Sequence, residues 1–334
     1  MFTRKQFIVK SSAALSVLAI PNFLFSLTKD LNMKEKDLFE VLIIGGSYSG
    51  LSAGLALARA RRKVLIIDSN QPCNRQTPYS HNFLTQDGTK PAEIASIAKT
   101  QLEKYDTVQF KDDVADSATV TDYGFEVKTQ TGKIFYTKKL IMATGLRDLL
   151  PAIPGLKESW GISVIHCPYC HGYEFNDQAT SIIANGSTGV GLVKLISNWS
   201  KQITLFTDGP STLTADEMVL LQRKRIEIVE TKIQALEHQN GMISRVLLSD
   251  GSSKDCRAVY MRPPVEQHSD IPLRLGAEFT AQGLLKVAES RLTTVPNLYA
   301  CGDNSSHRSV ASAVFTGSLA GSMVNASLID AEFI

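Results

Sequence analysis

The stretch from Phe39 to Asp68 restricts the fold of this chain more than any other part of the sequence. Phe39 to Ile44 (FEVLII) is a short apolar run rich in β-forming residues, which is typical of a buried strand. A glycine-rich turn follows, and after it LSAGLALARARR carries apolar side chains at helical spacing. A second strand, Val64 to Ile67 (VLII), ends at Asp68. Strand, glycine turn, helix, strand and acid together indicate a dinucleotide-binding α/β unit.

The turn itself departs from the usual fingerprint at one position. Ser47 stands where G-x-G-x-x-G has its middle glycine, so the approach of a diphosphate is more crowded than usual. Asp68 would accept hydrogen bonds from ribose hydroxyls. A turn that binds no phosphate is the alternative. We predict dinucleotide contacts from Gly45, Gly46, Ser47, Ser49, Gly50 and Asp68.

A second unit of the same kind follows later in the chain. Thr180 to Trp199 (TSIIANGSTGVGLVKLISNW) is again strand, glycine turn and helix, and Gln202 to Phe206 (QITLF) is the next strand. Here Ala184 replaces the first glycine. With 334 residues, 43% of them hydrophobic, the chain has enough apolar material for about two domains. The sequence therefore predicts an α/β protein with two doubly wound, Rossmann-like units.

The stretch HCPYCHGYE, from His166 to Glu174, places Cys167 and Cys170 two residues apart. Such a motif can attach haem, hold zinc, form a structural disulfide or cycle between dithiol and disulfide. Haem has no pocket assigned to it, and the nearby His and Cys side chains are too close along the chain to complete a zinc tetrahedron easily. The two-residue spacer favours a redox pair, and a structural disulfide stays open. We predict no metal site.

Further motifs carry a resemblance to a known family. Leu140 to Gly145 (LIMATG) is a strand ending in Ala-Thr-Gly, and Asn297 to Asp303 (NLYACGD) is a strand ending in Gly-Asp, followed by a helix of small residues. With GGSYSG, Asp68 and the Cys-x-x-Cys pair, these motifs resemble low-molecular-weight thioredoxin-reductase-like flavoproteins over about residues 38 to 330. The resemblance implies that FAD binds at the first turn. It also implies cofactor contacts from Asn82 of the loop Ser80 to Gly88, and from Ala143, Thr144, Gly145, Gly302 and Asp303.

The resemblance also implies how the chain is divided. An FAD-binding domain would consist of residues 37–146 and 261–330, and an inserted NAD(P)-binding-like domain, residues 147–260, would carry the Cys pair. A homodimer is expected for the same reason.

The nicotinamide site of this second domain is in doubt. NADPH-dependent members of the family grip the 2′-phosphate with a His-Arg-Arg cluster at the end of the next strand, where this chain has Thr207-Asp208-Gly209. A carboxylate there would repel a phosphate, and no guanidinium is left to bind it. Arg223, Lys224 and Arg225 are more simply an exposed helix face. The domain therefore takes NADH or no nicotinamide at all.

The residue after the pair, His171, directs the functional prediction. Thioredoxin reductases proper have an acid there, and Cys-x-x-Cys-His-Gly is similar to the branch that includes gliotoxin-type dithiol oxidases. By that resemblance Cys167 exchanges with substrate, Cys170 faces and reacts with the flavin, and His171 is the acid/base. His166 is assigned to capping the loop.

These assignments predict an FAD-dependent thiol–disulfide oxidoreductase. It would oxidise a small dithiol and pass the electrons to FAD and then to oxygen or another acceptor. The alternatives are an NAD(P)H-dependent reductase of a thioredoxin-like protein disulfide, and a flavin-bound redox sensor without turnover.

The N-terminus carries the excess of positive over negative charge in this chain. Arg4, Lys5 and Lys10 lie in an acid-free segment and account for the net charge of +2, so no basic surface for nucleic acid is predicted. Residues 1–28 combine a basic start with an apolar run, and Thr3 to Ile8 resembles a twin-arginine signal. We expect export to the periplasm, with a cytoplasmic protein as the alternative.

Overall fold

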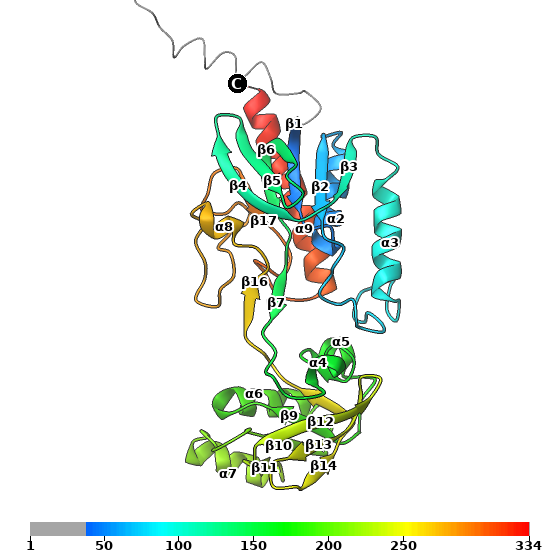
Figure 1. Ribbon diagram of the computed structural model, residues 1–334, viewed down its shortest axis with the longest axis vertical. Helices are drawn as coiled ribbons and strands as arrows, with labels where there is room; N and C mark the ends of the chain where they lie inside the picture. Colours follow the sequence, from blue (N-terminus) through cyan, green and yellow to red (C-terminus); the bar gives the residue numbers. More distant parts are fainter. Residues whose placement is uncertain (1–37, 334) are drawn as a thin grey trace, which may run out of the picture. The chain divides into compact units, whose positions relative to one another are not determined.

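The structure is a computed structural model that describes residues 38–333. The expected export signal at residues 1–28 lies outside the described residues. Within them, two larger sheets, one mixed and one parallel, are flanked by helices (Figure 1). The predicted α/β fold class is confirmed.

The first sheet has seven strands in the order β3-β2-β1-β6-β5-β4, with β17 paired to β6. The pairs β1–β2, β2–β3 and β6–β17 are parallel, and β4–β5 and β5–β6 are antiparallel. Strands β1 to β6 lie within residues 38–142, whereas β17 lies at residues 298–300. The sheet is therefore built from two parts of the chain that are far apart in the sequence. The strands are β1 (Leu38–Ile44), β2 (Val64–Asp68), β3 (Val108–Asp112), β4 (Ala115–Thr121), β5 (Gly124–Thr129), β6 (Ile134–Met142) and β17 (Leu298–Ala300).

Both faces of this sheet are buried, which explains the unbroken apolar runs of its central strands. Along β1, Leu42 and Ile44 belong to the core on one face, and Val41 and Ile43 belong to the core on the other. The second of these cores includes residues of α2 (Tyr48–Arg59) and α9 (Val310–Glu332), and α3 (Pro91–Leu102) adds Leu102 to it. The predicted strands of the first unit and its two small-residue helices are therefore confirmed.

Helices α2 and α9 approach closely because glycines face the contact. A Cβ on Gly317 would meet the Ser49 carbonyl oxygen, and one on Gly321 would lie 2.6 Å from the Ala53 carbonyl oxygen. Among the described residues, only α9 is long and apolar enough to cross a membrane. Its buried face packs against α2.

The second sheet is parallel throughout, with strand order β11-β10-β9-β15-β8. Helices α6 (Gly186–Ile196) and α7 (Ala215–Arg223) accompany it, and Arg223, Lys224 and Arg225 are exposed at the end of α7, as predicted. An antiparallel sheet of β12 (Ile233–Gln239), β13 (Met242–Leu248) and β14 (Ser253–Asp255) is added to this unit. The parallel strands are β8 (Val164–Ile165), β9 (Thr180–Ile183), β10 (Ile203–Phe206), β11 (Glu227–Val229) and β15 (Ala258–Tyr260).

Two short strands lie where the chain leaves the first sheet and returns to it. Strand β7 (Leu146–Asp148) pairs antiparallel with β16 (Val265–Gln267). The remaining helices are single turns, α4 (Leu156–Ser159), α5 (Pro168–His171) and α8 (Ile271–Arg274). All strands of the second sheet fall between these two crossings. The domain boundaries 37–146, 147–260 and 261–330 remain our proposal.

Candidate active site

The first glycine turn is shaped by close backbone packing. Gly45 has a φ of +104°, and a Cβ there would collide with the Ala143 carbonyl oxygen. A Cβ on Gly50 would overlap the Gly45 carbonyl oxygen. The turn thus brings α2 against the ends of β1 and β6, and a larger residue at either glycine would force them apart.

The N-terminus of α2 has features that suit an anionic ligand. Within residues 38–333 the side chain of its N-cap, Ser47, makes no capping hydrogen bond, and the first turn carries no acidic residue. The Gly46 N–H donates to Asp68 Oδ1 over 2.9 Å, which fixes the carboxylate at the end of β2. Unpaired N–H groups at a helix N-terminus bind phosphate, and a fixed carboxylate can accept from ribose hydroxyls. These residues fit a dinucleotide.

The Ala-Thr-Gly and Gly-Asp motifs meet at the ends of two neighbouring strands. Ala143, Thr144 and Gly145 follow β6, and Gly302 follows β17, where its N–H donates to Thr316 Oγ1 over 3.0 Å. The Thr144 hydroxyl is buried and finds no hydrogen-bond partner among the described residues. A buried hydroxyl of this kind normally has a partner, so it also fits a bound cofactor.

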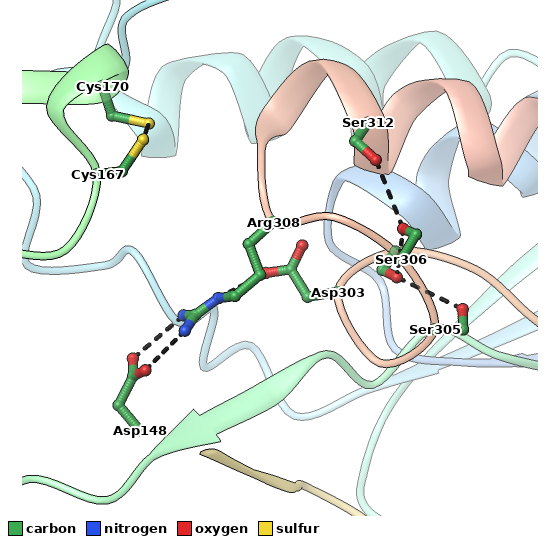
Figure 2. A network of polar contacts seen from close by, with 9 residues as sticks. Asp148, Cys167, Cys170, Asp303, Ser305, Ser306, Arg308 and Ser312 are labelled. Atoms are coloured by element: carbon green, nitrogen blue, oxygen red, sulfur yellow. Dashed lines mark hydrogen bonds and ion pairs between the residues drawn. The ribbon is translucent and has the colours of Figure 1, made fainter. Parts of the chain in front are cut away.

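Asp303 lies in a charged network that the sequence did not predict (Figure 2). Arg308 donates to both carboxylate oxygens of Asp148, over 2.7 and 3.2 Å, and its Nε lies 3.6 Å from Asp303 Oδ2. Burial raises the pKa of Asp303, and the Arg308 charge opposes this. Asp148 and Arg308 are 160 residues apart in the sequence. Each is a charged residue a few positions after a strand-ending motif, Asp148 after Ala-Thr-Gly and Arg308 after Gly-Asp, and only this pattern could have indicated the ion pair.

The Cys pair lies at the single-turn helix α5, with Cys167 at its N-cap. The Cys170 thiol donates to Cys167 Sγ over 3.0 Å. This bond, together with backbone N–H groups of Cys170 and Tyr169, lowers the pKa of Cys167 against the opposing effect of burial. The same bond and burial raise the pKa of Cys170. In the dithiol form, Cys167 is therefore the sulfur that ionises first.

The pair and the charged network interact electrostatically. Asp303 raises the pKa of the Cys170 thiol and Arg308 lowers it, although both effects are smaller than those of Cys167 and burial. The His307 imidazole, next to Arg308, adds to the lowering of the Cys167 pKa. The predicted cysteines are thus within electrostatic reach of the predicted Asp303, and Figure 2 shows both groups, apart from each other, in one view.

The two histidines that flank the pair have different surroundings. His166 stacks on Trp160 with ring centroids 6.0 Å apart, and burial lowers its pKa to about 4. Burial also lowers the pKa of His171, while Glu174 opposes this effect. Both imidazoles are neutral near pH 7, so His171 can accept a proton, and the packing of His166 suits a structural role.

The loop that contains Asn82 is exposed and tightly closed. Ser80 exchanges backbone hydrogen bonds with Thr89 and Gly88, and the Asn82 N–H donates to Asp87 Oδ1 over 2.7 Å. Asn82 itself is exposed, with a φ of +58°. Its predicted contact with flavin stays a prediction. The neighbouring His81, which the sequence did not single out, contacts the region after the Cys pair.

The second glycine turn is occupied by the chain itself. The Asn185 side-chain oxygen accepts from Gly186 N over 2.8 Å and from Thr212 N over 2.8 Å. The Asn185 amide donates to the Pro210 carbonyl over 2.9 Å. The loop after β10 is thereby tied across the N-terminus of α6. The Asp208 side chain also makes a hydrogen bond within the protein: its Oδ1 accepts from Ile233 N over 2.8 Å.

Metal chemistry has no candidate in this part of the chain. Within residues 38–333, no three His, Cys, Asp or Glu side chains are grouped so that they could hold an ion.

Comparisons with known proteins agree with this arrangement. Residues 39–317 match the family described as pyridine nucleotide-disulphide oxidoreductase. The chain is 31% identical over 312 residues to thioredoxin reductase tcpT of Claviceps purpurea (strain 20.1), covering 89% of this chain and 96% of the relative. It is also similar to the crystal structure of an oxidoreductase from Agrobacterium tumefaciens, with TM-score 0.82, 34% identity and coverage of 87% and 99%. The crystal structure of HlmI gives TM-score 0.84 and 31% identity, with coverage of 90% and 95%.

Proposed function

Because this chain belongs to the pyridine nucleotide-disulphide oxidoreductase family, we propose that it oxidises a small dithiol through Cys167 and Cys170. It is an FAD-dependent oxidoreductase of the thioredoxin reductase type. The direction of electron flow is the proposal. Electrons enter from the dithiol, and FAD passes them to molecular oxygen or another acceptor.

The observation that supports this direction is the state of the second glycine turn. In a nicotinamide-dependent enzyme the N-terminus of this helix receives the diphosphate. Here the Asn185 oxygen already accepts from Gly186 N, and the segment from Pro210 to Thr212 is bonded to the same side chain. A diphosphate would have to break these bonds, and the 2′-phosphate of NADPH would meet the Asp208 carboxylate at the end of β10. A nicotinamide is therefore a poor source of electrons for this chain.

The exchange begins with the pair as a disulfide. A substrate thiol loses its proton to the His171 imidazole, and its sulfur attacks Cys167 Sγ. The bond between Cys167 and Cys170 breaks, and Cys170 leaves as the thiolate. His171 releases the first proton to solvent and then accepts the proton of the second substrate thiol, whose sulfur attacks the substrate sulfur of the mixed disulfide and releases Cys167 as the thiolate. The substrate has lost two electrons to the pair, and two protons have left it.

Two features of the site favour these roles. Cys167 has the lowered pKa, so it is the better leaving group when the mixed disulfide is resolved. Arg308, held by Asp148, is a positive charge that lowers the pKa of the departing Cys170 thiol, which favours its thiolate. When bound, FAD supplies the two-electron acceptor that returns the pair to a disulfide. The glycines of the first turn, Asp68, Thr144 and Asp303 would hold it.

A steady-state assay tests this direction. Oxygen uptake is measured with dithiothreitol as the substrate, with and without NADH or NADPH. We expect uptake that depends on the dithiol and does not change when a nicotinamide is added. Turnover that requires a nicotinamide and a thioredoxin-like disulfide would support the second candidate function, which the name of the Claviceps relative favours.

Location and assembly are further parts of the proposal. We propose that residues 1–28 direct export and that the enzyme forms a homodimer. A reporter that is active only outside the cytoplasm, fused to residues 1–28, tests the first part. Arg4→Gln with Lys5→Gln should silence it. Light scattering of the purified protein tests the second part.

A further inference from the structure

A second imidazole, His81, lies beside the acid/base of the Cys pair. Its ring is edge-on to that of His171, with centroids 6.4 Å apart and planes at 89°. His81 Nε2 is 3.3 Å from Glu174 Oε1, and His81 Nδ1 is 3.7 Å from Asp87 Oδ1. His81 comes from the loop after β2, and Glu174 follows α5, so the fold brings these groups together from distant parts of the chain.

These groups form a row that ends at solvent. His171 and His81 are both partly exposed, and burial lowers the pKa of His171, so its imidazole is neutral near pH 7. The His81 side chain is 20% exposed, and the Glu174 side chain is 38% exposed. The titratable groups that act on His171 or face His81 are Glu174, His166 and Asp87. Exposure thus increases from His81 to Glu174, where a proton can pass to water.

The dithiol reaction needs such a path. Each turnover removes two protons from the substrate, and His171 can hold only one of them at a time. A base that keeps its proton cannot accept the second. A neighbouring imidazole can take the first proton, either directly or through one water molecule.

We propose that His81 and Glu174 carry protons from His171 to solvent during thiol–disulfide exchange. The inference rests on the proposed function, since it assumes that His171 accepts the substrate proton. A proton passes from His171 through one water molecule to His81 Nδ1, while His81 Nε2 gives its proton to Glu174 Oε1, which loses it to water. No electron moves in this step. His81 is a positioning and relay residue, because it acts through His171.

The test measures reduction of the oxidised pair by dithiothreitol in the full-length holoenzyme without oxygen. The reaction is quenched with acid, and thiols are counted by alkylation and mass, so that the readout needs no flavin step. At pH 7, His81→Ala and Glu174→Gln should each react about tenfold more slowly, at the lower end of what general acid–base catalysis contributes. Added imidazole should restore much of the rate in His81→Ala. At pH 9, where the reagent supplies its own thiolate, the deficit should shrink.

Glu93→Gln is the matched control for Glu174→Gln. Glu93 is an exposed glutamate in the first turn of α3, outside the relay, and the rate of this variant should stay within about twofold of wild type. Flavin content and thermal unfolding of each variant report on folding. A wild-type rate in His81→Ala at pH 7 would overturn the relay. An equal loss at pH 7 and pH 9 without rescue by imidazole would also overturn it. Wild-type enzyme that exchanges normally but consumes no oxygen would contradict the proposed function and leave the relay standing.

Discussion

The two glycine turns of this molecule start from similar local sequence and end in opposite states. At the first turn, the Ser47 side chain leaves the N-terminus of α2 without a capping bond among the described residues, and Gly46 orients Asp68. At the second, Asn185 caps α6 and ties down the loop at Thr212. A helix N-terminus needs partners for its N–H groups, which a ligand or the chain can supply. The comparison indicates a cofactor site at the first turn and a closed structural turn at the second.

The largest difference is expected for valine substitutions in the two helices. In Gly50→Val the side chain would overlap the Gly45 carbonyl oxygen, and overpacking of this kind costs about 1–3 kcal/mol. Flavin affinity should fall by roughly ten- to a hundredfold, measured as released flavin after chromatography. Gly191→Val in α6 is the control, because no heavy atom of the described residues lies within 4 Å of its Cβ. Equal flavin content in the two variants would refute the assignment of the cofactor to the first turn.

A smaller difference is expected for the two N-cap residues. Asn185→Ala removes the cap of α6 and its bonds to the loop, and should lower the free energy of unfolding by about 1–2 kcal/mol. Ser47→Ala should cost only about 0.5 kcal/mol or less, because that side chain makes no capping bond within residues 38–333. Urea unfolding of both variants after removal of FAD measures this, so that no cofactor contact of Ser47 adds to the result. The comparison fails if Ser47→Ala costs as much as Asn185→Ala.

The Cys pair provides the electron entry that the closed second turn does not. In Cys170→Ala, Cys167 loses the thiol that stabilises its thiolate, so its pKa should rise toward the ordinary thiol range. Because the thiolate is the reactive form, the midpoint of the pH profile for iodoacetamide alkylation of Cys167 should move to higher pH. Cys170→Ser keeps an O–H donor and should move it less. A midpoint unchanged in Cys170→Ala would mean that the α5 backbone alone sets the Cys167 pKa.

The smallest effect is expected at Asp208. Asp208→Asn keeps an oxygen that can accept from Ile233 N, so the free energy of unfolding should change by less than about 0.5 kcal/mol. The variant removes the carboxylate that would repel a 2′-phosphate, yet NADPH should still fail to reduce the flavin because Asn185 keeps the turn closed. If NADPH reduced the flavin quickly in this variant, the Asp208 carboxylate alone would be what prevents NADPH from reacting with the wild-type enzyme.

Local sequence predicted the strands next to the two glycine turns and the helices that follow them, but not the antiparallel strands β12 to β14 or the contacts that distinguish the two units. The strands and glycine turns follow from apolar runs and breakers within a short window, and both were confirmed. The cap on α6 depends on Thr212, 27 residues from Asn185, and the pair Asp148–Arg308 spans 160 residues. His81 and Glu174 likewise meet across distant loops. Such pairings are set by tertiary packing, and a single sequence carries no periodic signal for them.

One measurement decides most directly between the two routes of electron entry. Oxidised enzyme is mixed without oxygen with NADPH or with dithiothreitol, and flavin absorbance is followed over seconds. Each lost charge-assisted phosphate contact removes about 1.5–3 kcal/mol, so two of them weaken NADPH by about three orders of magnitude. We expect NADPH to leave the absorbance nearly unchanged and dithiothreitol to bleach it in wild type but not in Cys167→Ser. Immediate bleaching by micromolar NADPH would show that the second turn accepts a nicotinamide and that the enzyme works as a reductase.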